Sequence, residues 1–409
     1  MTEGSSAPPA GPTGSIQGNL WLARDVSAIG NWILFLSLLD FLYTFTDSPS
    51  MVGSLFLLWA LPGFLLGPIA RRFVTWRNAT AFGVTAQLLR AMLVLPLYFF
   101  DQNDGTQPIL LLALAAGIVA PFAGAANRAL LHAVLAPGQR ATAETALRTT
   151  WLLTAAVGPG LSYIIYGVSG LRSAATAVLV AYLLSGALLF LSRPTRQAEE
   201  AGQEVLPVFA PIPLRLAGAF SSPAARQVAA LEVASALLVG GVLVLEAAYT
   251  TSGLLVGIEN FSMVLAGQGL GMMIGGFFYF RFGRQFTHNV LAAGGLALLG
   301  GGEVGLAIST GLDAGLGLGC AIGAGIAVLG LALSDLGSRV ALSEGREMSR
   351  GLGTSVLVEG VAVLSVAIAG PLAESLSPRF ALVLVGILCV VLALYTFGSA
   401  PEADRSTNP

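Results

Sequence analysis

Carboxylates occur within several long apolar stretches of this chain, where an ionisable side chain is costly to place. The candidates among them are Asp40, Glu232, Glu246 and Glu359. A charged residue at the centre of a membrane helix costs roughly 2.5–3.5 kcal/mol on insertion scales, so an intramembrane carboxylate marks a transport pathway or a proton relay by default. Apolar surroundings favour the neutral carboxyl group, and a change of surroundings lets it release its proton. These four residues are therefore the candidates for proton coupling.

An inert role is also open for the same carboxylates. Asp40 and Glu246 lie toward the outer ends of their expected helices, where a tilted or shorter helix would leave them hydrated at the interface. Glu232 lies nearer the cytoplasmic end of the helix that carries Glu246, and Glu359 lies nearer the middle of its own. Proton coupling and interfacial hydration are thus alternatives that the sequence leaves open.

Arg90 lies in the middle of an apolar stretch, and a guanidinium group stays charged in a protein. It must therefore find a carboxylate or backbone carbonyl groups, and we expect it to clamp helices rather than to contact substrate. Glu144 and Arg148 are four residues apart, a spacing that pairs opposite charges on one helix face. Arg71 and Arg72 close the second stretch and are further candidates for structural or gating ion pairs.

Residues that could hold a metal or a cofactor are sparse. The chain has no lysine, and its two cysteines, Cys320 and Cys389, lie inside apolar stretches where a small thiol commonly packs. His132 and His288 have no Cys, Asp or Glu at metal-ligand spacing, and the sequence has no phosphate-binding loop for ATP. We expect no metal, no cofactor and no enzymatic activity, with a proton gradient as the energy source.

The composition indicates a membrane protein. Of the 409 residues, 55% are hydrophobic and 10% are charged, with a mean hydropathy of +0.80. A bilayer core of roughly 30 Å takes about 20 apolar residues per helix, and a helix satisfies its own backbone groups in lipid. The sequence therefore predicts an all-α integral membrane protein with twelve transmembrane helices. We expect these helices over 20–43, 51–70, 79–100, 109–131, 143–166, 173–191, 227–250, 254–280, 289–309, 314–336, 351–372 and 380–397.

The longest polar interruption lies between the sixth and seventh expected helices and divides the chain into halves. The first residues are rich in Gly, Pro and Ser and lack a basic residue, which favours a flexible tail over a cleaved signal peptide. The expected order is a cytoplasmic tail, a six-helix bundle, a cytoplasmic linker, a second six-helix bundle and a second tail. These segments cover 1–19, 20–192, 193–225, 226–398 and 399–409.

The placement of arginine predicts the orientation. Most arginines of the loops lie on the side of the N-terminus, and Arg172 and Arg379 lie on the opposite side. By the positive-inside rule both termini are cytoplasmic. We therefore expect a multi-pass protein of the plasma membrane, in a bacterium the inner membrane. The formal net charge of −2 gives no reason to expect a nucleic-acid partner.

Short glycine and proline motifs recur in the same order in the two halves. Small residues let membrane helices approach closely, and a proline frees a backbone group, so such positions suit packing or bending. Repeated halves with a site at their interface are typical of secondary transporters, although glycine and proline are common in membrane helices in any case. The expected hinge or packing positions are Gly67, Pro68, Gly158, Pro159, Gly275, Gly370 and Pro371.

Several motifs, taken in order, resemble the major facilitator superfamily, most closely its branch of enterobactin-exporter-like and macrolide-efflux-like permeases. The motifs are the stretch 20–49, Leu61-Pro62 to Pro68, Leu88 to Ala91, Ala129 to Leu131 with Pro137, and Gly158-Pro159. The resemblance implies two pseudo-symmetric six-helix bundles, with the first and seventh helices lining a central cavity and the ninth, which carries Glu303, at the periphery. The chain departs from the branch at Asn31 and Gln87, where Asp is usual, and at Arg148, where Asn is usual.

The resemblance and the intramembrane carboxylates together predict a secondary active transporter that works by alternating access. The expected activity is the export of an amphipathic small molecule, drug-like or siderophore-like, in exchange for protons, by a monomer. Multidrug antiport is one form of this activity. A lipid or lysolipid flippase on the same fold is the alternative, and a membrane receptor that has lost transport is a second. The expected partners are the lipid bilayer, the amphipathic substrate and protons.

Overall fold

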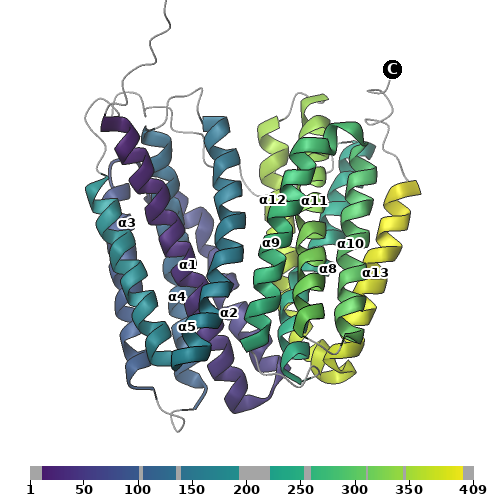
Figure 1. Cartoon of the computed structure of the whole chain (residues 1–409). Helices are drawn as coiled ribbons and strands as arrows, with labels where there is room; N and C mark the ends of the chain where they lie inside the picture. Colours follow the sequence, from purple (N-terminus) through teal and green to yellow (C-terminus); the bar gives the residue numbers. More distant parts are fainter. Residues whose placement is uncertain are drawn as a thin grey trace, which may run out of the picture.

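The structure is a computed structural model that describes residues 12–100, 105–134, 140–192, 222–252, 259–309, 312–343 and 347–398. All regular secondary structure in these ranges is helical. Figure 1 shows the helices gathered in two bundles that stand side by side, one from each half of the chain. The predicted all-α fold is confirmed.

The first bundle contains the helices of the N-terminal half. These are α1 (Pro12–Thr46), α2 (Pro49–Phe73), α3 (Ala79–Val94) with the short 3-10 helix η1 (Leu95–Tyr98), α4 (Gln107–Val134) and α5 (Arg140–Leu191). The second bundle contains the helices of the C-terminal half. These are α8 (Pro223–Ser252), α9 (Glu259–Phe282) with η3 (Gly283–Gln285), α10 (His288–Ile308), α11 (Leu312–Ser343), α12 (Glu347–Leu376) and α13 (Pro378–Gly398).

Helix α5 makes two membrane crossings that are joined at Gly170. The backbone of Gly170 has φ 72° and ψ −170°, a conformation that is essentially restricted to glycine. The second crossing is Gly170–Leu191, and the apolar helix Leu153–Tyr166 before it is shorter. In the described ranges, eleven helices are long and apolar enough to cross a membrane. Together with Leu153–Tyr166 they account for the twelve predicted transmembrane helices.

The ends of the expected segments differ from the helix ends in the structure. Helix α1 begins at Pro12, before the expected start of the first bundle at residue 20, because a proline is tolerated in the first helical turn. Hydropathy had identified only the apolar part of this helix. Helix α8 begins at Pro223, within the expected linker. Residues 1–11, 193–221 and 399–409 of the expected tails and linker lie outside the described residues.

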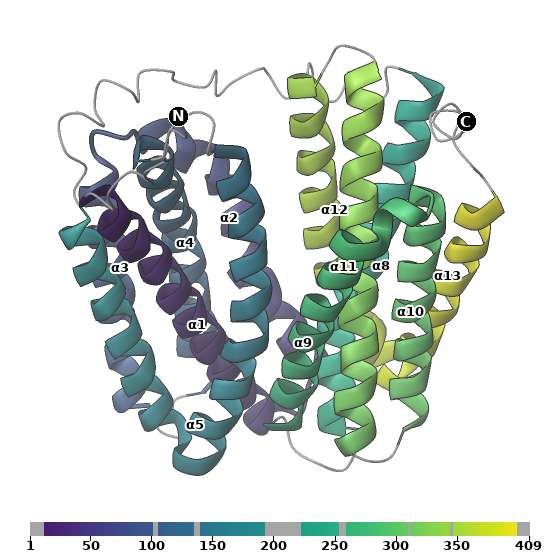
Figure 2. The same cartoon turned by 45° about the horizontal axis from the view of Figure 1, so that its top comes forward.

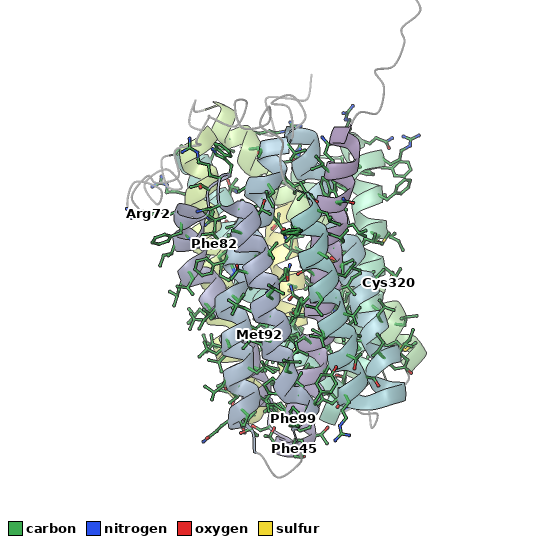
Figure 3. All side chains as sticks on the ribbon, turned by 90° about the vertical axis from the view of Figure 1, so that its left-hand side faces the viewer. Phe45, Arg72, Phe82, Met92, Phe99 and Cys320 are labelled. Carbon is green, nitrogen blue, oxygen red and sulfur yellow. The ribbon has the colours of Figure 1, made fainter. Side chains whose placement is uncertain are left out.

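Large apolar side chains cover the outer surface of the bundles. Figure 3 looks onto the outside of the first bundle, where Met92 is 64% exposed and Phe99 is 83% exposed. Exposed apolar surface of this extent would be unfavourable in water and suits contact with lipid. Arg72 lies at one end of this face, and Phe45 and Phe99 lie at the opposite end.

Close packing of α9 against α11 builds the core of the second bundle. The glycines Gly267, Gly271 and Gly275 recur every four residues on α9 and face α11. A Cβ atom at Gly267 would lie 2.6 Å from the carbonyl oxygen of Leu316, and one at Gly275 would lie 2.6 Å from that of Ala324. Small residues at this spacing let two membrane helices touch through their backbones. Gly275 is therefore a packing position.

The two bundles contact each other through α5 with α9 and through α2 with α12. Gly269 of α9 lies directly on the backbone of Ala155 and Ala156, so that a Cβ atom there would overlap it. At the second contact, a Cβ atom at Gly53 would lie 3.1 Å from the Cα atom of Gly370. Figures 1 and 2 show the bundles meeting at the end remote from the termini and standing apart at the end where the termini lie.

Candidate functional site

Two carboxyl groups meet inside the second bundle, that of Glu246 on α8 and that of Glu303 on α10. Both side chains have 0% exposure, and the two carboxyl groups lie close enough to interact with each other. The amide Nε2 of Gln268, on α9, donates to Oε1 of Glu246 at 2.5 Å. Three helices thus form one polar cluster in an apolar interior. We call Glu246, Glu303 and Gln268 the carboxyl site.

Contacts between neighbouring helices fix the carboxyl site. One turn beyond Glu246, the hydroxyl group of Tyr249 donates to the backbone carbonyl of Ala307 at 2.8 Å, which joins α8 to α10. Gln268 is held from the side of α11, where Gly323 lies against its backbone carbonyl. Glu246 and Glu303 lie within the last two turns of α8 and α10, so the site is nearer the end remote from the termini.

Among the described residues, neither carboxyl group has a cationic partner. In the described part of the chain, no arginine forms an ion pair with Glu246 or Glu303. Within the same ranges, Oε2 of Glu246 and both oxygens of Glu303 accept no hydrogen bond from an amide or hydroxyl donor. Two unit charges about 4 Å apart repel by about 4 kcal/mol at an effective dielectric constant of about 20, before the cost of desolvation. The arrangement is chemically suited to bind protons.

The sequence alone predicts only one member of the carboxyl site. Glu246 is one of the four candidates, Glu303 lies on a helix that the resemblance places at the periphery, and no motif indicates Gln268. The sequence does hold a signal for Glu303, because a glutamate follows three glycines in an otherwise apolar helix. No local pattern connects it with Glu246, because the two lie on different helices.

The other three candidate carboxylates lie apart from the carboxyl site. Asp40 is half-buried on α1, and its backbone carbonyl accepts a hydrogen bond from the Thr44 hydroxyl at 2.8 Å. Glu232 is half-buried on α8 beside Gly337 of α11, fourteen residues and roughly 21 Å along the helix from Glu246. Glu359 is exposed on α12. Proton coupling at these residues stays a prediction.

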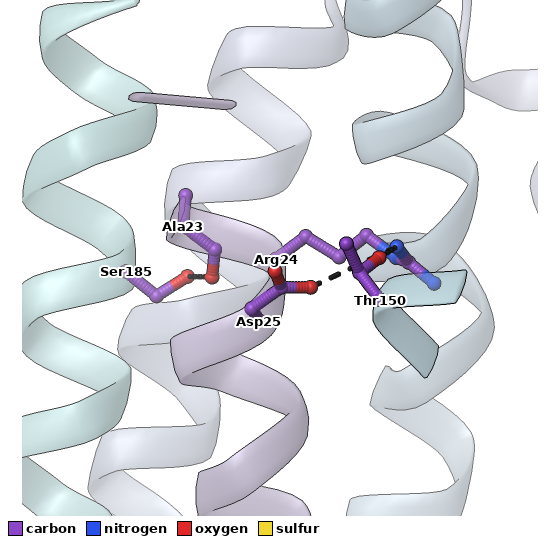
Figure 4. A network of polar contacts seen from close by, with 5 residues as sticks. All are labelled: Ala23, Arg24, Asp25, Thr150 and Ser185. Atoms are coloured by element: carbon purple, nitrogen blue, oxygen red, sulfur yellow. Dashed lines mark hydrogen bonds and ion pairs between the residues drawn. The ribbon is translucent and has the colours of Figure 1, made fainter. Parts of the chain in front are cut away.

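A buried network of polar side chains connects helices of the first bundle around Gln87. Its amide Nε2 donates to the hydroxyl groups of Ser27 and Ser185, at 2.9 Å each. The Ser185 hydroxyl donates in turn to the backbone carbonyl of Ala23 at 2.7 Å, a bond drawn in Figure 4. Gln87, Ser27 and Ser185 are nearly inaccessible to solvent. The network joins α1, α3 and α5.

Arg90 lies beside this network and clamps the same helices. Its Nη1 donates to the Ser27 hydroxyl at 3.2 Å, and its guanidinium carbon lies 5.6 Å from the centre of the Tyr182 ring. The Tyr182 hydroxyl donates to Oδ1 of Asn31 at 2.8 Å. No carboxylate pairs with Arg90 in the described part of the chain. A hydroxyl group and an aromatic face thus take the place of the carboxylate or carbonyl groups that we expected.

Replacing Ser185 by alanine is expected to destabilise the first bundle. The substitution removes the donor to Ala23 and leaves one hydrogen of the buried Gln87 amide unpaired, which costs about 1–3 kcal/mol. The melting temperature of the purified protein in detergent measures the effect. Ser338→Ala is the matched control, because its exposed hydroxyl bonds only to the carbonyl of Ser334 in its own helix, at 2.8 Å. Equal melting temperatures for the two variants would contradict a stabilising network.

A second polar cluster on α1 lies nearer the termini and was not expected from the sequence. Nη1 of Arg24 lies 3.7 Å from Oδ1 of Asp25 and donates to the Thr150 hydroxyl of α5 at 2.5 Å. Figure 4 shows the three side chains directed toward one another between α1 and α5. Asp25 is half-buried, and the adjacent Arg24 guanidinium group offsets only part of the cost of its charge.

The expected gating pairs are only partly described. The side chains of Glu144 and Arg148 lie outside the described residues. Arg71 and Arg72 are exposed at the terminal end of α2. These pairs stay predictions.

The hinge or packing positions fall into two groups. Gly158 and Gly370 are close-contact positions, since a Cβ atom at Gly158 would lie 2.6 Å from Cβ of Trp32 and one at Gly370 would lie 3.0 Å from the Pro49 carbonyl. Gly67 has no such contact, because the nearest atom to an added Cβ is Nη2 of Arg71 at 3.9 Å. The three prolines of the set all lie inside helices. Pro159 is buried, Pro68 is half-buried and Pro371 is exposed.

A polar contact seals the α2–α12 interface at the end remote from the termini. The carboxylate of Glu374, on α12, accepts hydrogen bonds from the hydroxyl groups of Ser48 at 3.4 Å and of Ser50. Gly53 and Gly370 pack against each other one turn further in. We call Ser48, Ser50, Gly53, Gly370 and Glu374 the α2–α12 seam.

Solved structures with the same arrangement of helices are transporters. A bacterial homologue of the human lysosomal transporter Spinster, inward-facing and unoccupied, matches with a TM-score of 0.71 at 14% identity, over 98% of each chain. A bacterial homologue of the iron transporter ferroportin, inward-facing, matches with a TM-score of 0.67 at 15% identity, over 94% of this chain and 99% of the other. This is the major facilitator fold.

The nucleoside transporter NupG has the same major facilitator fold, with a TM-score of 0.68 at 13% identity over 94% of this chain and 98% of the other. No protein-family model and no curated protein sequence matches the chain. At these identities the likeness establishes the fold alone. In the major facilitator fold of this chain, the carboxyl site lies inside the second bundle and the α2–α12 seam lies between the bundles.

Proposed function

We propose that this chain is a secondary active transporter that exports an amphipathic small molecule in exchange for protons, by alternating access. The observation that carries the proposal is the asymmetry between the two ends of the molecule. At one end the bundles meet backbone to backbone at Gly53 with Gly370 and at Gly269 with Ala156, and at the other end they stand apart. Backbone contacts on the side remote from the termini, with the bundles apart at the terminal end, suit two bundles that rock about a central site.

Aromatic side chains near the bundle interface support an amphipathic substrate. Trp59 of α2 and Phe35 of α1 have ring centroids 5.2 Å apart, and both belong to or pack against the main apolar core. Phe64 reaches across to α12, where its ring would lie 3.3 Å from a Cβ atom at Gly360. Large apolar side chains with a few polar groups are typical of sites for drug-sized ligands. These aromatic side chains agree with the resemblance to the enterobactin-exporter-like and macrolide-efflux-like branch.

The proposed setting is the plasma membrane, in a bacterium the inner membrane, with both termini in the cytoplasm. The exposed arginines at the terminal ends of α2 and α11, Arg71, Arg72 and Arg339, support this orientation through the positive-inside rule. A proton gradient would supply the energy, and a monomer is sufficient because each chain carries both bundles. In the proposed orientation, the carboxyl site lies in the outer half of the membrane.

Glu246→Gln is expected to lower proton-driven transport to about a tenth or less, because the amide cannot exchange a proton. The measurement is uptake of labelled amphipathic cations into inverted vesicles with an imposed inside-acid gradient. Glu359→Gln is the matched control, because this carboxylate is exposed on α12. Full gradient-driven uptake by Glu246→Gln would contradict the proposal. Loss in Glu359→Gln alone would move proton coupling to α12.

The same vesicles separate the alternative functions. Gradient-independent movement of a fluorescent lysolipid, without uptake of cations, would favour a flippase. Binding of either compound without any movement across the membrane would favour a receptor that has lost transport. We regard export as the better supported function, because the aromatic side chains near the interface suit a compact ligand.

A further inference from the structure

We propose that Glu246 and Glu303 form a single proton-binding site, in which Glu303 holds a proton and donates its hydrogen bond to the Glu246 carboxylate. A hydrogen bond between two carboxyl groups requires a proton on one of them, because an ionised carboxylate only accepts. Glu246 and Glu303 are fully buried, and among the described residues no cation pairs with either of them, so the pair favours at least one bound proton. The role of this site in transport rests on the proposed function, whereas its existence does not.

The third side chain of the carboxyl site decides which group carries the proton. Gln268 donates its amide hydrogen to Oε1 of Glu246 at 2.5 Å, and this bond favours the ionised form of Glu246. Among the described residues, no amide or hydroxyl group donates to either oxygen of Glu303. Glu303 is thus the acid and Glu246 the acceptor. Gln268 is a positioning residue, because it orients Glu246 toward Glu303.

The described helices around the pair supply no compensating cation. Cys389 of α13 is a further titratable group near Glu303, and a Cβ atom at Gly300, one turn before Glu303, would lie 2.8 Å from the Cβ atom of Cys389. Tyr249 lies one turn beyond Glu246 on α8. The charge of Arg379, at the start of α13, interacts electrostatically with Tyr249. Neither carboxyl group forms an ion pair with Arg379. The described surroundings therefore favour a net charge of −1 or 0 at the site, which is one or two bound protons.

The site is also connected to the contact between the bundles. Gln268 is followed by Gly269, which lies on the backbone of Ala156 of α5. A second proton on Glu246 would remove the charge that Gln268 binds, and the hydrogen bond between α9 and α8 would weaken. Helix α9 thus carries both a contact of the carboxyl site and a contact between the bundles.

Infrared spectroscopy of the full chain in lipid nanodiscs tests the shared proton without any transport assay. At neutral pH the wild type is expected to show a protonated-carboxyl C=O band that disappears in Glu303→Gln and persists in Glu359→Gln. Should Glu303→Gln fail to fold, Glu303→Asp is expected to keep the band at a shifted frequency. An unchanged band in the Glu303 variant that folds would overturn the proposal.

Transport measured on the same samples separates this site from the proposed function. If Glu303→Gln removes the band but the wild type transports independently of the proton gradient, the proton site is established. The same result refutes proton-coupled transport. If transport is driven by the gradient but the infrared band does not depend on Glu303, the shared-proton site is refuted. The proposed function would remain supported in that case.

Discussion

Gly269→Leu is expected to abolish transport while leaving both bundles folded. A side chain at this position overlaps the backbone of Ala155 and Ala156, so the contact between α5 and α9 cannot form. Helix α9 stays in its bundle, because Gly267, Gly271 and Gly275 face α11 instead. The state in which the bundles meet remote from the termini is thereby lost, and a transporter confined to one state cannot complete its cycle. Vesicle uptake measures the loss.

The conformational shift itself can be followed at the α2–α12 seam. In a cysteine-free background, maleimide labelling of Ser48→Cys is expected to become faster when Gly269→Leu is added, because the seam opens. Gly294→Leu on α10 is the matched control, since no atom lies within 4 Å of a Cβ added there. Wild-type uptake by Gly269→Leu, or unchanged labelling, would show that the α5–α9 contact does not define a transport state.

Gly323→Leu is expected to prevent stable folding of the second bundle. A Cβ atom at Gly323 would overlap the backbone carbonyl of Gln268, and backbone cannot move aside as a flexible side chain can. Helices α9 and α11 would have to separate, at a cost of about 3 kcal/mol or more. Thermal unfolding in detergent and the yield of monodisperse protein measure this cost.

Another glycine of the same helix provides the control for Gly323→Leu. A Cβ atom added at Gly317 has no atom within 4 Å, so Gly317→Leu is expected to unfold like the wild type. Both variants add the same apolar volume to α11. Equal loss of stability in the two would show that helix propensity, rather than contact with α9, determines the result.

The sequence predicted one half of the carboxyl site and missed the other. Glu246 could be identified because an acidic residue in an apolar helix is costly and visible in one stretch of sequence. Glu303 is equally visible, but its pairing with Glu246 depends on how α8 and α10 turn toward each other. The hydrogen bond from Tyr249 to Ala307 fixes that orientation, and no spacing within one helix encodes it.

The partners of Arg90 in the first bundle could not be predicted from the sequence for the same reason. That a buried guanidinium group must find partners follows from its permanent charge. Which partners it finds does not follow, and the structure supplies the Ser27 hydroxyl and the Tyr182 ring where we expected a carboxylate or carbonyl groups. Those residues come from α1 and from the far end of α5, so only the assembled bundle places them beside Arg90.

By itself the sequence determined the membrane class, the twelve helices and the small residues Gly158, Gly275 and Gly370 at which helices pack closely, because apolar length and residue size are local properties of one segment. The tertiary structure decided which helices touch and therefore which polar groups meet. In lipid, apolar side chains do not select one helix partner over another, so the contacts are set by backbone approach at small residues such as Gly269 and Gly323. Such contacts join residues far apart in the chain. For that reason Glu246 was predicted from sequence, and its pairing with Glu303 only emerged from the fold.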